Sequence, residues 1–214
     1  AQQGIPLVDI SGGLHASEIA GSQHTPNLAY ELVSRATEPA TKEILDNSIL
    51  FLWPRINPDG QDIVVNWCRE SLAGRNPAPM ELYQKYIGHD NNRDFFASTQ
   101  PETENINRVL YHDWFPQILY NHHQSGPQGT VVWSPPLRDP YNYNLHPALV
   151  LGFQSLGAAM HTRLALENKP GATLRTGGPY DGWWNGGIRN TAAFHNTIAL
   201  LTEMNGNPTP MRIP

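Results

Sequence analysis

The sequence predicts a layered α/β domain with a largely parallel or mixed central sheet. Short apolar runs with the length of buried strands alternate along the chain with longer patterns that have the period of a helix. The length of 214 residues suits one domain, or at most two, and is sufficient to bury a sizeable core. We therefore expect a central sheet layered with helices.

Apolar runs predict the strands of this sheet. Four of them have the composition of buried strands and lie at residues 7–10, 49–53, 117–120 and 197–201. A weaker run at residues 130–133 is a fifth candidate. Because helical patterns separate these runs, parallel pairing between the strands is favoured.

Helical patterns fill the intervals. They cover residues 19–36, with an interruption near Pro26, and residues 61–72, 101–114 and 147–167. The clearest begins with Pro101, which suits the first helical position. Its apolar stripe consists of Ile106, Val109, Leu110 and Trp114. The stripe of the last helix consists of Leu149, Phe153, Leu156, Met160 and Leu164.

Long segments rich in Gly, Pro and Asn are predicted to be loops. They lie at residues 76–94, 125–147 and 175–196. Loops of this size in a compact domain are usually functional, and these adjoin predicted strand ends, where open α/β sheets bind their ligands. The shorter segment at residues 57–60, with the sequence Asn-Pro-Asp-Gly, is interpreted as a tight turn.

Composition excludes several classes of function. The net charge of −5 and the lack of a basic stripe argue against a nucleic-acid binder, and no apolar run approaches the ~20 residues needed to span a membrane. Cys68 is the only cysteine, so the chain has neither a disulfide framework nor a cysteine-based zinc cluster. Its apolar neighbours predict a buried, inert thiol. Arginine outnumbers lysine by 11 to 3, which hints at recognition of carboxylate or phosphate groups.

An imidazole and a carboxylate stand three residues apart just after the first predicted strand, as His15 and Glu18. At this spacing the two side chains can share one face of a helical turn, and both suit Zn²⁺. A catalytic zinc site needs a third protein ligand. His122 and His123 follow the strand at residues 117–120, and because neighbouring strand residues point to opposite faces, we expect one of them to face the site.

Two further groups suit the chemistry of such a site. Asn92 and Arg93 can grip a carboxylate through charge-assisted hydrogen bonds, the alternative being a surface salt bridge of Arg93. Glu203 follows the apolar run at residues 197–201 and can serve as a general base toward a metal-bound water. The alternative for Glu203 is a solvated carboxylate at a strand end.

The order of these motifs resembles that of the zinc metallocarboxypeptidases of the carboxypeptidase A type. His-x-x-Glu, Asn-Pro-Asp-Gly, Asn-Arg, a strand-end His and a strand-end Glu follow one another from about Pro6 to Glu203. The resemblance implies one catalytic domain over residues 1–214, with a three-layer α/β/α sandwich around a mixed, largely parallel sheet. The segment at residues 125–147 is more similar to divergent bacterial members than to the digestive enzymes. Because the chain starts in a strand just before the zinc motif, we expect a domain that lacks N-terminal strands of the family.

The resemblance also implies a role for each of the residues in these motifs. One zinc ion is held by His15, Glu18 and His123, with His122 as the neighbour on the opposite face. Asn92 and Arg93 bind the terminal carboxylate of the substrate, and Glu203 is the general base.

The resemblance implies two further roles. Tyr180, which lies 23 residues before Glu203, matches a mobile tyrosine that caps the bound substrate. An arginine that polarises the scissile carbonyl is expected between the Asn-Pro-Asp-Gly turn and the Asn-Arg pair, where Arg69 and Arg75 compete and Arg69 is assigned the role.

The expected activity is zinc-dependent hydrolysis of C-terminal peptide bonds in peptides or proteins, by a metal-activated water and the base Glu203. Two alternatives stay open: a zinc amidase or deacylase on the same fold, and an inactive peptidase-like module that binds C-termini. The family resemblance favours a secreted or periplasmic location. The sequence leaves open the preferred C-terminal residue and the oligomeric state.

Overall fold

The protein is described by a computed structural model that covers residues 4–75 and 89–206. Within these residues a six-stranded sheet has the order β2-β1-β3-β8-β4-β6. Its strands are β1 Leu7–Ser11, β2 Ile49–Trp53, β3 Ile118–Gly126, β4 Val132–Trp133, β6 Ala172–Thr173 and β8 Ile198–Asn205. Only β4 and β8 pair antiparallel, so the sheet is mixed and mostly parallel, as predicted.

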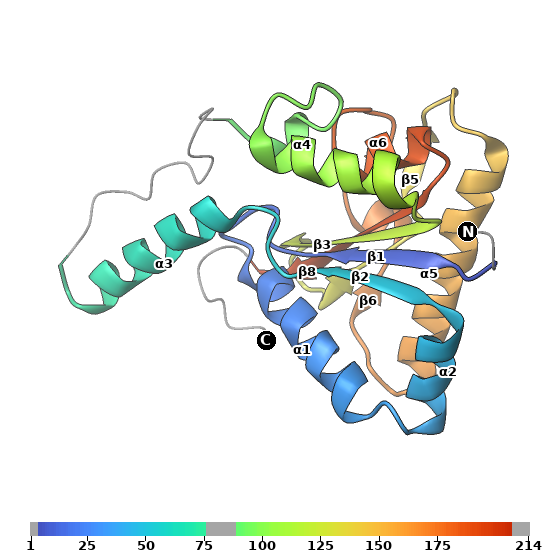
Figure 1. The fold of residues 1–214 in the computed structure, drawn as a ribbon, viewed down its shortest axis with the longest axis horizontal. Coiled ribbons are helices and arrows are strands. Elements are labelled where there is room, and N and C mark those ends of the chain that lie inside the picture. The colour runs from blue at the N-terminus through green and yellow to red at the C-terminus, as the bar shows by residue number, and fades with distance from the viewer. Residues whose placement is uncertain (1–3, 76–88, 207–214) are drawn as a thin grey trace.

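Helices cover both faces of the sheet (Figure 1). Those on one face are α4 Pro101–Arg108, its π-helical continuation η2 Val109–Trp114, and α6 Ile188–Phe194. Those on the other are α1 Ile19–Ser34, α2 Pro39–Asn47 and α5 Pro147–Leu166. Alternating strand residues divide between two cores: Leu119 and Ala199 pack under α4 and α6, whereas Tyr120 and Leu200 pack against α5. This confirms the expected three-layer arrangement.

The predicted strands are all present, but four of them differ from the prediction. β3 and β8 run further than their apolar residues, so His123 and Glu203 lie inside strands and not beyond them. β2 was predicted to be buried, yet its residues are partly exposed or exposed because β2 is the edge strand of the sheet. β4 comprises only two residues of the predicted run.

The helix predictions need corrections. α1 is continuous through Pro26. The proline costs the helix one backbone hydrogen bond, and the packing of α1 against β1, β2 and β3 offsets this loss. The turn at residues 57–60 is instead the start of α3 Pro58–Leu72, where Asn57 Oδ1 accepts a hydrogen bond from Gly60 N at 2.8 Å. Trp114 is 50% exposed, because the wider π-helical turn takes it off the apolar stripe of α4.

Two of the predicted loops contain short elements. The segment at residues 125–147 holds β4 and β5 Arg138–Tyr141, and the segment at residues 175–196 holds η3 Arg175–Gly177, β7 Asp181–Gly182 and α6. Residues 76–88 of the third predicted loop lie outside the described residues. The helix α2 was not predicted, because its nine residues hold only two large apolar side chains, Ile44 and Leu45, too few for a periodic pattern.

Cys68 is exposed, so the prediction of a buried thiol is wrong. It lies on α3, which extends away from the sheet and buries only two residues, Gly60 and Val64 (Figure 1). The apolar neighbours of Cys68 therefore do not indicate burial. In the described part of the chain, no helix is long and apolar enough to cross a membrane.

Replacing Asp9 by asparagine is expected to stabilise the protein at pH 8 and to change its stability little at pH 4. Asp9 lies in β1 under α4 and is 1% exposed; burial raises the pKa of its carboxyl to about 7, against the lowering effect of the hydrogen bond from Trp53. The folded protein therefore keeps a proton that the unfolded chain loses above about pH 4, and this group's contribution to the free energy of unfolding falls between about pH 4 and pH 7. The loss is about 4 kcal/mol.

The measurement is the melting temperature of wild-type and Asp9→Asn protein from pH 4 to pH 8. Asp62→Asn, at an exposed position of α3, is the control. Equal effects of Asp9→Asn at both ends of the pH range would contradict this interpretation.

Candidate active site

Close packing of two glycines brings the loop after β1 to the start of α1. A Cβ on Gly12 would lie 2.4 Å from the carbonyl oxygen of Gly21, so only glycine allows this approach. Gly13 adopts φ +67°, a left-handed conformation that glycine takes without strain. The loop then turns so that Glu18 N donates to the carbonyl oxygen of His15 at 3.0 Å, which places both side chains on one side of the turn.

Strand pairing brings His123 beside Glu203. β3 and β8 are parallel, and His123 and Glu203 are register partners, so their side chains leave the same face of the sheet. Asn121, two residues before His123, shares that face. His122 points to the opposite face, where its Nδ1 lies 2.9 Å from Tyr120 Oη and 2.7 Å from Thr202 Oγ1.

His15, Glu18 and His123 converge on one point. Their ligand atoms all lie within 4.8 Å of one another, and the Nδ1 atoms of the two histidines each lie 2.9 Å from a different oxygen of Glu18. Ligand atoms around a tetrahedral zinc with bonds of about 2.0–2.2 Å lie roughly 3.5 Å apart, so a small adjustment of these side chains would admit the ion. The donor set of two imidazoles and one carboxylate therefore fits zinc.

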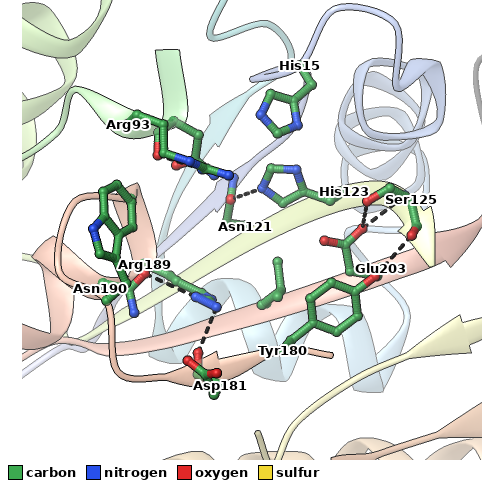
Figure 2. Close-up of a pocket in the computed structure, with 14 residues that line it drawn as sticks. His15, Arg93, Asn121, His123, Ser125, Tyr180, Asp181, Arg189, Asn190 and Glu203 are labelled. Atoms are coloured by element: carbon green, nitrogen blue, oxygen red, sulfur yellow. Dashed lines mark hydrogen bonds between the residues drawn. The ribbon is translucent and has the colours of Figure 1, made fainter. Parts of the chain in front are cut away.

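The other ring nitrogen of each histidine is held by an oxygen atom. His15 Nε2 lies 2.8 Å from Asp90 Oδ1, and His123 Nε2 is hydrogen-bonded to Asn121 Oδ1 (Figure 2). With a proton kept on each Nε2, both Nδ1 atoms would bind a cation once it displaces the second proton of His15. Carboxylate and amide partners of this kind orient metal-binding histidines.

Charge pairing dominates the electrostatics of this cluster. Burial opposes the charge on His15, but its hydrogen bonds to Asp90 and Glu18 raise its pKa to about 10. Burial likewise opposes the charge on Glu18, yet hydrogen bonds from His123 and His15 hold the pKa of that carboxyl well below its usual range. Glu18 is therefore ionised, the form that binds a cation.

Glu203 is buried, so it is not the solvated strand-end carboxylate that was the alternative. It is 5% exposed, and its Oε2 accepts hydrogen bonds from Ser125 N at 2.9 Å and Ser125 Oγ at 3.0 Å. Burial raises the pKa of Glu203, against the lowering effects of His123 and Ser125. A raised pKa makes a carboxylate a stronger proton acceptor near neutral pH.

A pocket of about 660 Å³ opens in front of this cluster. Its lining includes six of the predicted site residues, namely His15, Asn92, Arg93, His123, Tyr180 and Glu203. Its volume is within the usual range for small-molecule and peptide-end sites. The structure thus brings residues from distant parts of the chain to one pocket.

Tyr180 lies across the pocket from the histidines (Figure 2). Its hydroxyl donates to the carbonyl oxygen of Ser125 at 2.9 Å, and its ring contacts Trp133 with 4.7 Å between ring centroids. Burial, together with the nearby Glu203, raises the pKa of Tyr180 to about 12, so the hydroxyl keeps its proton and remains a donor.

Asn92 and Arg93 reach the pocket from the short 3₁₀ helix η1 Asn91–Arg93. Asn92 Oδ1 accepts from Ile188 N at 2.9 Å, which leaves its NH₂ group as the end able to donate to a ligand. The guanidinium of Arg93 lies 5.2 Å from the centre of the Trp184 ring and is 54% exposed. Its Nη1 lies 3.5 Å from Asp90 Oδ2, so the salt bridge named as the alternative for Arg93 is present. Both side chains thus present hydrogen-bond donors to the pocket.

Arg69 and Arg75, the candidates for carbonyl polarisation, are not among the residues that line the pocket. Arg69 is exposed in the last turn of α3, which extends away from the sheet. Arg75 follows α3, is exposed, and forms an ion pair with Glu70. The structure therefore does not bring Arg69 to the site.

Sequence reasoning missed several residues of the site. Asn121 was recoverable, because it lies two strand positions before His123 and hence on the same face. Asp90 precedes the Asn-Arg motif, but nothing local connects it to His15. Arg189 and Asn190 line the pocket from α6, and they lie in a segment that was predicted to be a loop.

Comparisons with known proteins agree with this geometry. A sequence model described as zinc carboxypeptidase matches residues 1–144, two thirds of the chain. None of the curated protein sequences matches significantly.

Solved structures with the same fold are distant in sequence. Carboxypeptidase A from Helicoverpa armigera superposes with a TM-score of 0.66 at 16% identity, covering 97% of this chain and 54% of that one. A metallo-carboxypeptidase from Burkholderia cenocepacia gives 0.63 at 13%, covering 94% and 48%. A succinylglutamate desuccinylase from Silicibacter sp. TM1040 gives 0.52 at 12%, covering 96% and 51%. The chain thus spans about half the length of each of these proteins, and at these identities the likeness concerns the fold alone.

Proposed function

The chain belongs to the zinc carboxypeptidase family, and from that premise we propose that it hydrolyses the C-terminal peptide bond of peptides or proteins. It is a hydrolase of the zinc carboxypeptidase-like superfamily, whose members on this fold include both peptidases and deacylases. One observation supports the more specific proposal: His15 and His123, which cluster with Glu18, line the same pocket as the carboxylate of Glu203 and the guanidinium of Arg93.

His15, Glu18 and His123 would hold one zinc ion. When bound, zinc acts as a Lewis acid and makes water a usable nucleophile at neutral pH. Glu18 would supply the negative charge that a divalent cation needs, and Asp90 and Asn121 hold the two rings with Nδ1 toward Glu18.

Glu203 acts as the general base. It takes a proton from the attacking water and passes the proton to the nitrogen of the leaving amine, so it ends the reaction in its starting state. The two hydrogen bonds from Ser125 to Oε2 fix the carboxylate and leave Oε1 for this exchange. Tyr180 keeps its proton and would exchange its hydrogen bond to the Ser125 carbonyl oxygen for one to the substrate.

Asn92 and Arg93 bind the terminal carboxylate of the substrate. The NH₂ group of Asn92 and the fork of Arg93 offer several donors to one carboxylate, and such bonds are stronger than those between neutral groups. Fixing the chain end in this way restricts cleavage to the last peptide bond, because that bond alone is then held near Glu203.

The test compares peptides with a free and an amidated C-terminus on purified, zinc-loaded protein. We expect chelator-sensitive release of the C-terminal residue from the free acid, restored by added zinc. The amidated peptide should react about 10- to 100-fold more slowly, because the charge-assisted bonds to Arg93 are lost.

The same experiment separates the rival functions. N-acyl amino acids present the same terminal carboxylate and a similar amide bond, so cleavage of these compounds without cleavage of peptides would identify a deacylase. Chelator-resistant release, or no release from a broad peptide panel, would refute the peptidase proposal. Peptide binding without any hydrolysis in zinc-loaded protein would identify a binding module.

A further inference from the structure

A second guanidinium, that of Arg189, belongs to the pocket. Arg189 lies in the first turn of α6, and Figure 2 shows it, like Arg93, on the side of the pocket opposite Glu203. Its Nη1 donates to Asn190 Oδ1 at 3.1 Å and its Nη2 donates to the carbonyl oxygen of Asp181 at 2.8 Å. Both acceptors are neutral amide oxygens, so neither compensates the charge of Arg189.

The charge of Arg189 has no partner carboxylate among residues 4–75 and 89–206: none lies within ion-pair distance of it. Burial lowers the pKa of the Arg189 guanidinium, against the raising effects of Glu203 and Asp181, and its Nε is shut off from solvent without a hydrogen bond. Arg189 is partly buried, and a cation partly withdrawn from water gains from an anion that comes to it.

The two carboxylates that raise the pKa of Arg189, those of Glu203 and Asp181, make their contacts with other residues. Asp181 Oδ2 lies 3.2 Å from Arg138 Nη2, and Asp181 Oδ1 accepts from Trp183 N at 3.1 Å. Glu203 Oε2 is held by Ser125. Neither is directed at Arg189, so the guanidinium remains available to a ligand.

We propose that Arg189 binds a second carboxylate on the substrate, so that the enzyme prefers a C-terminal residue with an acidic side chain, glutamate or aspartate. This inference rests on the proposed function, in which Arg93 takes the terminal carboxylate. One ordinary C-terminal residue brings one carboxylate to a pocket with two guanidiniums, whereas glutamate and aspartate bring two.

The lining beside Arg189 is mostly polar, and it includes the carboxylate of Asp181, whose charge is paired with Arg138. Among the described residues that line the pocket, Leu201 is the one aliphatic side chain. If the C-terminal residue of the substrate were apolar, its side chain would cover Arg189 without offering an acceptor. If it were lysine, its side chain would add a like charge. The side-chain amide of Asn190, which is 8% exposed, adds polar surface beside Arg189.

The competing interpretation is that Arg189 only braces the segment at Asp181 and Asn190. A bracing residue would affect all substrates alike when it is replaced. A residue that binds the side-chain carboxylate would change the preference between an acidic residue and its neutral isostere.

The decisive pair is two peptides that are identical except for a C-terminal glutamate or glutamine. On wild-type, zinc-loaded protein we expect kcat/KM to be at least about 10-fold higher for the glutamate peptide. Arg189→Gln should bring this ratio to about one. Arg93→Gln is the matched variant: it should lower kcat/KM for both peptides and keep the ratio.

Three results would overturn the inference: equal rates for the two peptides with wild-type protein, a ratio that survives in Arg189→Gln, or a ratio that collapses in Arg93→Gln instead. The first readout uses wild-type protein, so it does not depend on whether a variant folds.

Calorimetric binding of free glutamate and glutamine to zinc-loaded protein separates this inference from the proposed hydrolysis. Tighter binding of glutamate that depends on Arg189, in a protein that cleaves no peptide, would sustain the acidic ligand class and refute the peptidase. Cleavage of both peptides at equal rates would refute the acidic preference and sustain the peptidase. Equal binding of glutamate and glutamine without cleavage would refute both.

Discussion

Replacing Glu203 by glutamine is expected to lower kcat for peptide hydrolysis by about 100- to 10,000-fold, the usual contribution of a general base. The glutamine amide has nearly the same size and can still accept the hydrogen bonds from Ser125, but it cannot take a proton from water. Because Glu203 is not one of the three clustered ligands, the variant should bind zinc as the wild-type protein does.

The measurement is the steady-state rate with a free-acid peptide, together with the zinc content of the same preparation. Glu43→Gln, at an exposed position of α2, is the control and should leave both values unchanged. A Glu203→Gln protein that is zinc-loaded and turns over at the wild-type rate would rule out the proposed role of this carboxylate.

Replacing His123 by alanine is expected to abolish stable zinc binding and with it the hydrolysis. Two protein ligands would remain, His15 and Glu18, and the negative charge of Glu18 would lose one of its two imidazole partners. Removing a residue that only hydrogen-bonds to a metal ligand typically lowers metal affinity 10- to 100-fold. Removing the ligand His123 itself should lower zinc affinity by more than this.

His122→Gln is the matched control, because His122 is adjacent in sequence but faces Tyr120 and Thr202 on the other side of the sheet. We expect it to retain one zinc per chain, as measured by metal analysis after dialysis and by competition with a chromogenic chelator. Zinc retention by His123→Ala, or its loss in His122→Gln alone, would reverse the assignment of the third ligand.

Local patterns were sufficient to predict most of the fold. The apolar runs identified β1, β2, β3 and β8, and the helical stripes identified α4 and α5. The prediction of a helix break at Pro26 was wrong because it weighed the cost of one missing hydrogen bond without the packing of α1 on the sheet. The prediction of loop structure at residues 175–196 was wrong because α6, at seven residues, is too short for a periodic pattern.

For the site too, local patterns predicted features set by neighbouring residues and missed features set by distant segments. The period of a strand predicted that only one of His122 and His123 would face the metal cluster, and the structure places His123 there. Arg69 was selected from its position along the chain, and it stays outside the pocket because α3 extends away from the sheet. Sequence order does not report the direction in which a helix leaves a fold.

The sequence by itself determined the layered α/β class, the His15–Glu18 pair and the strand faces of His122 and His123, since these follow from residues close together in the chain. Only the tertiary structure decided that Glu203 stands beside His123, that Asp90 holds His15, and that α6 brings Arg189 to the pocket. The physical reason is that strand register and helix placement depend on hydrogen bonds and packing between segments far apart in sequence, which leave no local pattern.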